Sequence, residues 1–338
     1  MIDKILFECI IKDERLIIYK KNKVNMDFFK ERANTTDNPQ ETIGLDIGSR
    51  MIKWVCLDEN HVLKHYAIHA IPFPITAAHR EAKMASCLKE TLLEREFIKN
   101  CILNIPDSLI FSYWVEIDYP SSQTIHEVIE WLVGKSILCP VNELYFDYQI
   151  FDLSHQNQCN VLIVACRKEH LDFRVNIVHE AHLIPTVVEV NSHALERACL
   201  FFYPKFNQEN NVLLEISTSQ MTFLFFNTDQ PQPVVYCENL LNERDQENIL
   251  LQIKRNIKRY VLSHPDYSVN QITLIGSDPS LVHYLLIQLD GFLKINVKNL
   301  EKECMAHSEL NKNFLRLFLS YGLALRSYAK KKEKNEIG

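Results

Sequence analysis

The sequence predicts an α/β protein whose fold is duplicated into two lobes. Residues 43–55 have the pattern of an apolar strand that carries one acid, Asp46, followed by a glycine-containing turn and a second apolar strand. Residues 213–225 repeat this pattern at an offset of 169 residues, which places Asp46 on Glu215. A strand–acid–turn–strand unit that occurs twice indicates two related lobes with a nucleotide-sized cleft between them.

A third extended segment follows each unit, at 62–71 and at 233–239, and continues the internal similarity. Hydrophobic periodicity predicts the rest of the first half. The expected elements are a helix at 77–93, strands at 100–105 and 110–117, a helix at 124–135, strands at 143–151 and 159–165, a helix at 167–182, a strand at 185–190, and a helix to 202 that Ser192 caps.

The second half begins near Asn211. Its expected elements are a long helix at 244–262, a strand at 271–275, a turn at 276–279, a helix to 289 and a last helix at 313–328. The lysine-rich residues 330–334 are expected to form a frayed tail, with attraction to an anionic membrane surface as the alternative. The basic residues of the long helix are interpreted as a solvated face rather than a site for an acidic ligand: Lys254, Arg255, Lys258 and Arg259.

Composition excludes several classes of protein. The chain has 338 residues, 47% of them hydrophobic, and a formal net charge of -6, which argues against a general nucleic-acid binder. No apolar run approaches the ~18 residues of a membrane span, and the N-terminus lacks the pattern of a secretory signal. Ten cysteines without a Cys-x-x-Cys pair indicate reduced structural thiols, and the histidines form no convincing zinc set. We therefore expect a cytoplasmic protein.

An acid at the end of a strand, beside a turn of exposed backbone amides, suits a nucleotide and its magnesium ion. The amides around Gly48 can cradle phosphate oxygens, and the carboxylate of Asp46 can hold the metal or its waters. Asp-x-Gly also forms ordinary hairpin turns, which is the structural alternative. The chain has only seven glycines, so it keeps the strand framework while weakening the ligand site.

Six short segments occur in an order that points to a known family. They are MDFFK at 26–30, GLDIGS at 44–49, IPDS at 105–108, ACRKE at 165–169, VVEV at 187–190 followed by ALERA at 194–198, and YGLALR at 321–326. With these segments the chain resembles the PilM family, the actin-like cytoplasmic proteins of type IV pilus assembly, over residues 26–328. It resembles the cell-division protein FtsA more distantly.

The resemblance implies a duplicated actin-like ATPase (ribonuclease H-like) fold of the actin/Hsp70 superfamily. Such a fold has two lobes, with an α+β subdomain inserted in the first. The implied division is an N-terminal extension and short helix at 1–40, a first-lobe core at 41–81 and 184–208, an inserted subdomain at 82–183, a second lobe at 209–328 and a basic tail at 329–338.

The resemblance also implies a binding site for ATP and Mg²⁺ on three loops. Its residues are Asp46, Gly48, Ser49 and Lys53 on the first loop, Glu215, Ser217 and Thr222 on the second, and Gly276 and Ser277 on the third, with Asp46 and Glu215 as the metal ligands. The second loop has Glu215, Ile216 and Ser217 where the family has Asp-x-Gly, and the third has Gly276 and Ser277 where the family has a Gly-Gly pair. Asp278 adds a negative charge that is expected to repel a polyphosphate if it faces inward. The family has an acid within the helix at 124–135, and here Leu132 takes its place. No catalytic residue is assigned.

The implied function is that of a scaffold in type IV pilus assembly, or in a related DNA-uptake or secretion system. The expected partner is a PilN-like single-pass inner-membrane protein, whose N-terminal cytoplasmic peptide docks between the first lobe and its insert. Pilus motor components are further expected partners, and nucleic acid is not. The protein is then cytoplasmic, at the inner face of the inner membrane. The alternatives are a slow Mg-dependent ATPase acting as a nucleotide switch and, less favoured, an actin-like small-molecule kinase.

Overall fold

The computed structural model describes residues 41–72, 77–93, 95, 97–118, 125–152, 158–228, 233–240, 245–292, 295–300 and 313–335. These residues form two compact units. The second unit is Ser192–Gly322, and the first consists of the described residues before and after it. The expected extension at 1–40, with its MDFFK segment, lies outside the described residues.

The first unit is built on a five-stranded mixed sheet. Its strands are β1 (Thr42–Ile47), β2 (Met51–Leu57), β3 (Leu63–Ala70), β4 (Asn100–Ile105) and β8 (Ile184–Val190), in the order β3-β2-β1-β4-β8. The first three form an antiparallel meander, whereas β1, β4 and β8 run parallel to one another. The carboxyl ends of these parallel strands meet at one edge of the sheet, which is where α/β proteins bind ligands.

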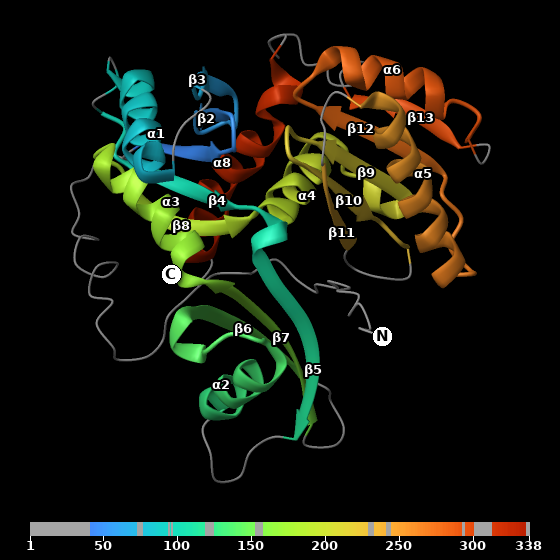
Figure 1. Ribbon diagram of the computed structural model, residues 1–338, viewed down its shortest axis with the longest axis horizontal. Coiled ribbons are helices and arrows are strands. Elements are labelled where there is room, and N and C mark those ends of the chain that lie inside the picture. Colours follow the sequence, from blue (N-terminus) through green and yellow to red (C-terminus); the bar gives the residue numbers. More distant parts are fainter. Residues whose placement is uncertain are drawn as a thin grey trace. The chain divides into compact units, whose positions relative to one another are not determined.

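Two helices, α1 (Ala77–Leu92) and α3 (Lys168–Glu180), lie side by side against this sheet (Figure 1). Leu88 of α1 packs into a core made by alternate strand residues such as Leu45. Because successive side chains of a strand point to opposite faces, Asp46 is directed to the other face of the sheet. The apolar core therefore fixes the orientation of the acid.

A smaller three-stranded antiparallel sheet has the order β5-β7-β6 and carries the helix α2 (Figure 1). Its elements are β5 (Ile110–Asp118), α2 (Ile125–Ser136), β6 (Leu144–Asp152) and β7 (Gln158–Arg167). Ile129 of α2 and Ile163 of β7 belong to a core of their own. Because β4, α1 and α3 belong to the first sheet and its covering layer, this inserted sheet occupies less of the chain than the expected 82–183.

The second unit contains another five-stranded sheet, in the order β11-β10-β9-β12-β13. Its elements are β9 (Asn211–Ile216), β10 (Gln220–Phe225), β11 (Val234–Asn239), α5 (Gln246–Ser263), β12 (Gln271–Gly276), α6 (Pro279–Leu289) and β13 (Asn296–Asn299). Tyr260 of α5 stacks on Phe225 of β10 with 3.9 Å between the ring centroids, and both rings are buried. The short strand β13 was not predicted from the sequence.

The two five-stranded sheets have equivalent strand orders and directions, which confirms the predicted duplication. In the first sheet Asp46 of β1 lies opposite Lys53 of β2. In the second sheet Glu215 of β9 lies opposite Thr222 of β10. Both pairs are related by the same offset of 169 residues, so the internal similarity extends to the register of the strands.

Helices α4 (Asn191–Phe202) and α8 (Phe314–Asn335) approach each other very closely at Ala194 and Gly322, two residues of the second unit. A Cβ atom on Gly322 of α8 would lie 1.9 Å from the backbone oxygen of Ala194 of α4. Arg197 of α4 donates a hydrogen bond to the backbone oxygen of Gly322 at 2.9 Å. Only a residue without a side chain permits this approach, so Gly322 is required by packing.

Some predicted boundaries were wrong. Helix α4 begins at Asn191, and Ser192 is a buried residue of its first turn rather than its cap. Helix α5 begins at Gln246, and its cap is Asp245, which accepts a hydrogen bond from the backbone of Asn248. The lysine-rich residues 330–334 continue α8 instead of forming a tail, because lysine is a good helix former.

No helix in the described ranges, α8 included, has both the length and the apolar character needed to cross a bilayer.

Candidate functional site

The first candidate loop joins β1 to β2 at the carboxyl edge of the first sheet. The backbone amide of Gly48 donates to the oxygen of Met51 at 2.9 Å and closes the turn. A Cβ atom on Gly48 would lie 3.0 Å from the same oxygen, so any side chain would press on the turn. The glycine therefore keeps the loop narrow, and Ser49 is exposed beyond it.

Asp46 and Lys53 form an ion pair beneath this loop. The Lys53 amine lies 2.6 Å from one carboxylate oxygen of Asp46, and the two side chains are only 12% and 6% exposed. The pair spans neighbouring strands in register, which places it at the end of β1. Removing one partner of such a pair leaves a charge in a poorly solvated place. The Lys53 amine thus contacts the Asp46 carboxylate that was expected to bind Mg²⁺.

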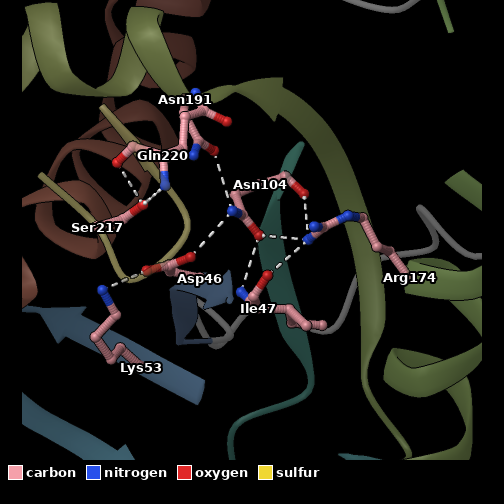
Figure 2. A network of polar contacts seen from close by, with 8 residues as sticks. All are labelled: Asp46, Ile47, Lys53, Asn104, Arg174, Asn191, Ser217 and Gln220. Carbon is pink, nitrogen blue, oxygen red and sulfur yellow. Dashed lines mark hydrogen bonds and ion pairs between the residues drawn. The ribbon is translucent and has the colours of Figure 1, made fainter. Parts of the chain in front are cut away.

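Asn104, at the end of β4, is the centre of a hydrogen-bond network (Figure 2). Its side-chain nitrogen donates to Asp46 and to the side chain of Asn191, each at 3.0 Å. Its side-chain oxygen accepts from the backbone amide of Ile47 at 2.9 Å. Asn104 is 1% exposed, so one amide joins the ends of β1 and β4 to the start of α4.

Arg174 of α3 completes the network from the other side of the sheet. Its guanidinium group donates to the backbone oxygen of Ile47 at 2.9 Å and to the side-chain oxygen of Asn104 at 3.1 Å (Figure 2). Burial lowers the pKa of Arg174 to about 10, and the charge of Asp46 opposes this shift. The group stays protonated at neutral pH. Lys53 and Arg174 together exceed the charge of Asp46 by one, which favours an anion beside the loop.

The second candidate loop joins β9 to β10 in the second unit. The Ser217 hydroxyl donates to the backbone oxygen of Gln220 at 2.9 Å and accepts from its backbone amide at 3.2 Å (Figure 2). The side chain of Gln220 donates to the Thr222 hydroxyl at 3.0 Å. Ser217, which the 169-residue offset places on Gly48 of the first loop, therefore uses its hydroxyl to close its own turn.

The third candidate loop follows β12. A Cβ atom on Gly276 would lie 2.7 Å from Cγ2 of Val282 in α6, so a side chain here would have to displace this buried valine. The backbone amide of Ser277 points to the oxygen of Ile216 at 3.4 Å. The carboxylate of Asp278 accepts from the amides of Ser280 and Leu281 and caps α6. The negative charge of Asp278 therefore interacts with the partial positive charge at the N-terminus of α6.

The structure brings the predicted residues together within each unit. Asp46 and Lys53 are in contact in the first unit, and Glu215 lies in register with Thr222 in the second. Among the described residues, no group of three or more histidine, cysteine or acidic side chains is arranged to hold a metal ion. The residues of the first loop fit a phosphate group better than a metal, because both oxygens of Asp46 already have donors.

Sequence reasoning missed three polar residues at this edge: Asn104, Arg174 and Glu189. Glu189, near the end of β8, forms an ion pair with Arg326 of α8, and both side chains are buried. An asparagine or a glutamate within an apolar strand is the signal that could have found two of them, since buried polar groups require partners. Arg174 lies in an amphipathic helix and gives no such signal.

Comparisons with known proteins agree with this architecture. A family model described as type IV pilus assembly protein PilM matches residues 44–238. Among solved structures, a chain of a PilM-PilN type IV pilus biogenesis complex is similar with a TM-score of 0.70 and 18% identity, covering 86% of this chain and 99% of that chain. The expected duplicated actin-like fold is thus confirmed.

Other solved structures are similar at lower scores. The ethanolamine utilization protein EutJ from Carboxydothermus hydrogenoformans has a TM-score of 0.50 and 11% identity, covering 85% of this chain and 90% of that chain. A Bacteroides thetaiotaomicron protein with an actin-like ATPase fold and unknown function has a TM-score of 0.49 and 14% identity, covering 83% of this chain and 95% of that chain.

Proposed function

Because the chain belongs to the family of the type IV pilus assembly protein PilM, we propose that it is a cytoplasmic scaffold of a type IV pilus or a related DNA-uptake or secretion system. It binds the N-terminal peptide of a PilN-like inner-membrane protein, which holds it at the inner face of that membrane. The observation that carries this proposal is the family match over residues 44–238. The similarity of fold to a chain from a PilM-PilN complex supports it.

The peptide site is proposed at the junction of the inserted sheet with the first sheet. The Tyr145 hydroxyl of β6 donates to Asp172 of α3 at 3.0 Å. The Lys168 amine of α3 lies 5.2 Å from the centre of the Tyr145 ring. An aromatic ring flanked by an acid and an amine offers apolar area and polar groups together, as peptide-binding surfaces do.

The test is binding of a labelled synthetic peptide with the N-terminal sequence of the PilN-like protein encoded by the same organism. Fluorescence polarisation with the full chain should show saturable binding, at least tenfold tighter than for the scrambled peptide. Tyr145→Ala should weaken binding at least tenfold. Phe97→Ala, which removes a ring 49% exposed in the same unit, is the matched control and should not. Equal binding of the scrambled peptide would overturn the proposal.

ATP with Mg²⁺ is proposed as a structural ligand or switch of this scaffold. The excess positive charge of Lys53 and Arg174 over Asp46 supports a phosphate site at the first loop. The nucleotide would be held by Asp46, Gly48, Ser49, Lys53, Glu215, Ser217, Thr222, Gly276 and Ser277. Glu215 would lie on the metal side, and Asp46 would join it once the phosphate had taken the amine of Lys53 from its carboxylate. A bound phosphate would compete with Asp46 for the amine of Lys53.

The second candidate function is a slow Mg-dependent ATPase, which the intact first loop favours. The self-closed turn at Ser217 argues against it, because that hydroxyl is already used within the loop. Phosphate release that requires Mg²⁺ and disappears in a folded Asp46→Ala variant would support the ATPase. A small-molecule kinase is less favoured, since no acid has been assigned as the base for a substrate hydroxyl.

A further inference from the structure

Helix α5 of the second unit exposes two leucines on its outer face. Leu251 is 66% exposed and Leu262 is 81% exposed. The inner face of the same helix is already occupied, because Ile253 and Ile257 are fully buried in the core of this unit. The exposed leucines therefore do not serve the fold.

The exposed residues of α5 follow a regular spacing. Leu251, Arg255, Lys258 and Leu262 are separated by four, three and four positions, and all four are exposed. This spacing keeps residues on one side of a helix and is the spacing of a seam that meets a second helix. The stripe, defined as these four residues, extends about 16 Å along α5 at 1.5 Å per residue.

Aromatic rings lie beside cations in the stripe and next to it. The Lys254 and Lys258 amines lie 5.3 and 5.9 Å from the centre of the Phe292 ring. On the other side Arg259 lies 5.8 Å from the ring of Tyr236. These aromatic rings hold the long side chains close to the helix, and the charges stay near the leucines.

Acidic groups near the stripe reduce this charge only in part. Arg255 forms an ion pair with Glu238 of β11 at 2.7 Å, with 61% of the arginine side chain still exposed. Glu247 lies in the first turn of α5. Against these two acids and the cap Asp245 stand the four cations of the helix, in a chain whose net charge is -6. The stripe is thus a local basic surface on an acidic protein.

We infer that the stripe on α5 docks an acidic amphipathic helix of a protein partner. The leucines at both ends of the stripe give that helix apolar contacts. Lys258, and the part of Arg255 that its pair with Glu238 leaves exposed, attract carboxylates opposite. A partner helix with the order leucine, acid, acid, leucine at the same spacing satisfies both requirements. This surface lies in the second unit, so it goes beyond the peptide site proposed in the first.

An anionic bilayer is the competing occupant, and the stripe fits it less well. Arg255 and Lys258 lie in line between Leu251 and Leu262, so the cations interrupt the apolar contact that a bilayer would need. A membrane-binding helix instead separates its apolar residues from its basic face. The four-three-four spacing, by contrast, is the spacing at which two packed helices meet.

The test uses a designed, fluorescein-labelled helical peptide with leucine, glutamate, glutamate and leucine at this spacing. The full chain should bind it, and Lys258→Glu and Leu262→Ser should each weaken binding at least tenfold. Matched controls are Lys89→Glu and Leu93→Ser in the first unit, where both side chains are exposed and binding should not change. A peptide with lysine in place of glutamate should bind Lys258→Glu better than the unmodified chain.

Three results would overturn the inference. The first is equal binding of the glutamate and lysine peptides to the unmodified chain. The second is binding that Lys258→Glu and Leu262→Ser leave unchanged. The third is sedimentation with phosphatidylglycerol vesicles that both variants abolish, combined with no binding of the peptide, which would assign the stripe to a membrane.

Discussion

The side-chain amide of Asn104 donates to a carboxylate oxygen of Asp46 at 3.0 Å. Asn104 thereby supports Asp46, the acid that the sequence predicts at the first loop. The same amide accepts from the backbone of Ile47 and from Arg174, so the position of Asp46 depends on β4 and on α3 as well as on its own strand. The first candidate loop is therefore positioned by three elements of the first unit, β1, β4 and α3.

Asn104→Leu should destabilise the first unit by about 3 kcal/mol, because the backbone amide of Ile47 loses its acceptor and the buried guanidinium group of Arg174 keeps only backbone oxygens as acceptors. Urea unfolding monitored by circular dichroism measures this loss. Asn60→Leu, at an exposed turn, is the control and should cost much less. Equal losses for the two variants would mean that the network does not stabilise the sheet edge.

Asp46→Ala should lower the free energy of unfolding by about 3 kcal/mol even without nucleotide, because the largely buried charge of Lys53 loses its ion-pair partner. The exposed pair of Lys64 with Glu41 provides the comparison, and Lys64→Ala should cost less. Chemical unfolding of both variants checks the difference. A stable Asp46→Ala variant would show that the acid is not held by its ion pair.

Glu189 and Arg326 should show strong coupling in a double-mutant cycle. Each single change, Glu189→Leu or Arg326→Met, removes the ion-pair partner of a buried charge and should cost about 3–5 kcal/mol. The double variant should recover much of that loss, because it leaves no charge behind. Additive losses in thermal or chemical unfolding would contradict the expected coupling.

Gly322→Ala should destabilise the protein by about 3 kcal/mol or more, because the new methyl group would lie 1.9 Å from the backbone of Ala194. Helices α4 and α8 would have to separate, since backbone atoms cannot turn aside as a side chain can. Gly134→Ala in α2 is the control, where the new atom would meet only the Val141 side chain. Similar melting temperatures for the two variants would argue against the close crossing.

The Tyr145 hydroxyl should lose its proton at a higher pH than an ordinary tyrosine. Burial, the hydrogen bond to Asp172 and the charge of Asp172 raise its pKa to about 12, from an ordinary value of 10.0. Its neutral form is favoured in the folded state, so the stability it contributes is present below pH 10 and is lost as the pH rises towards 12. Carbon-13 NMR of labelled tyrosine rings measures this pKa. Asp172→Asn should lower it, and an unchanged value would contradict the contact.

The duplicated strand plan could be predicted because alternation of apolar residues and the 169-residue offset are properties of the sequence. The pairing of Asp46 with Lys53 and of Glu215 with Thr222 follows from that plan, since hairpin register fixes which residues are opposite. Most predicted strands and helices lie within a few residues of the observed ones for the same reason.

The polar network could not be predicted because its partners are distant in the sequence. Asn104 and Arg174 meet only when α3 packs on the sheet, and no motif marks either residue. Asp278 was expected to repel phosphate, but its carboxylate caps α6, which local sequence alone could have suggested. The roles proposed for the loop residues toward ATP and Mg²⁺ stay predictions.

The most direct test of the scaffold is a calorimetric titration of the PilN-like N-terminal peptide into the full chain, with and without Mg-ATP. The account predicts one saturable peptide site per chain in both conditions. Mg-ATP should change the affinity of this site, but the peptide should also bind without it. Absence of binding in both conditions by a folded protein, together with steady Mg-dependent phosphate release, would contradict the scaffold and favour the ATPase.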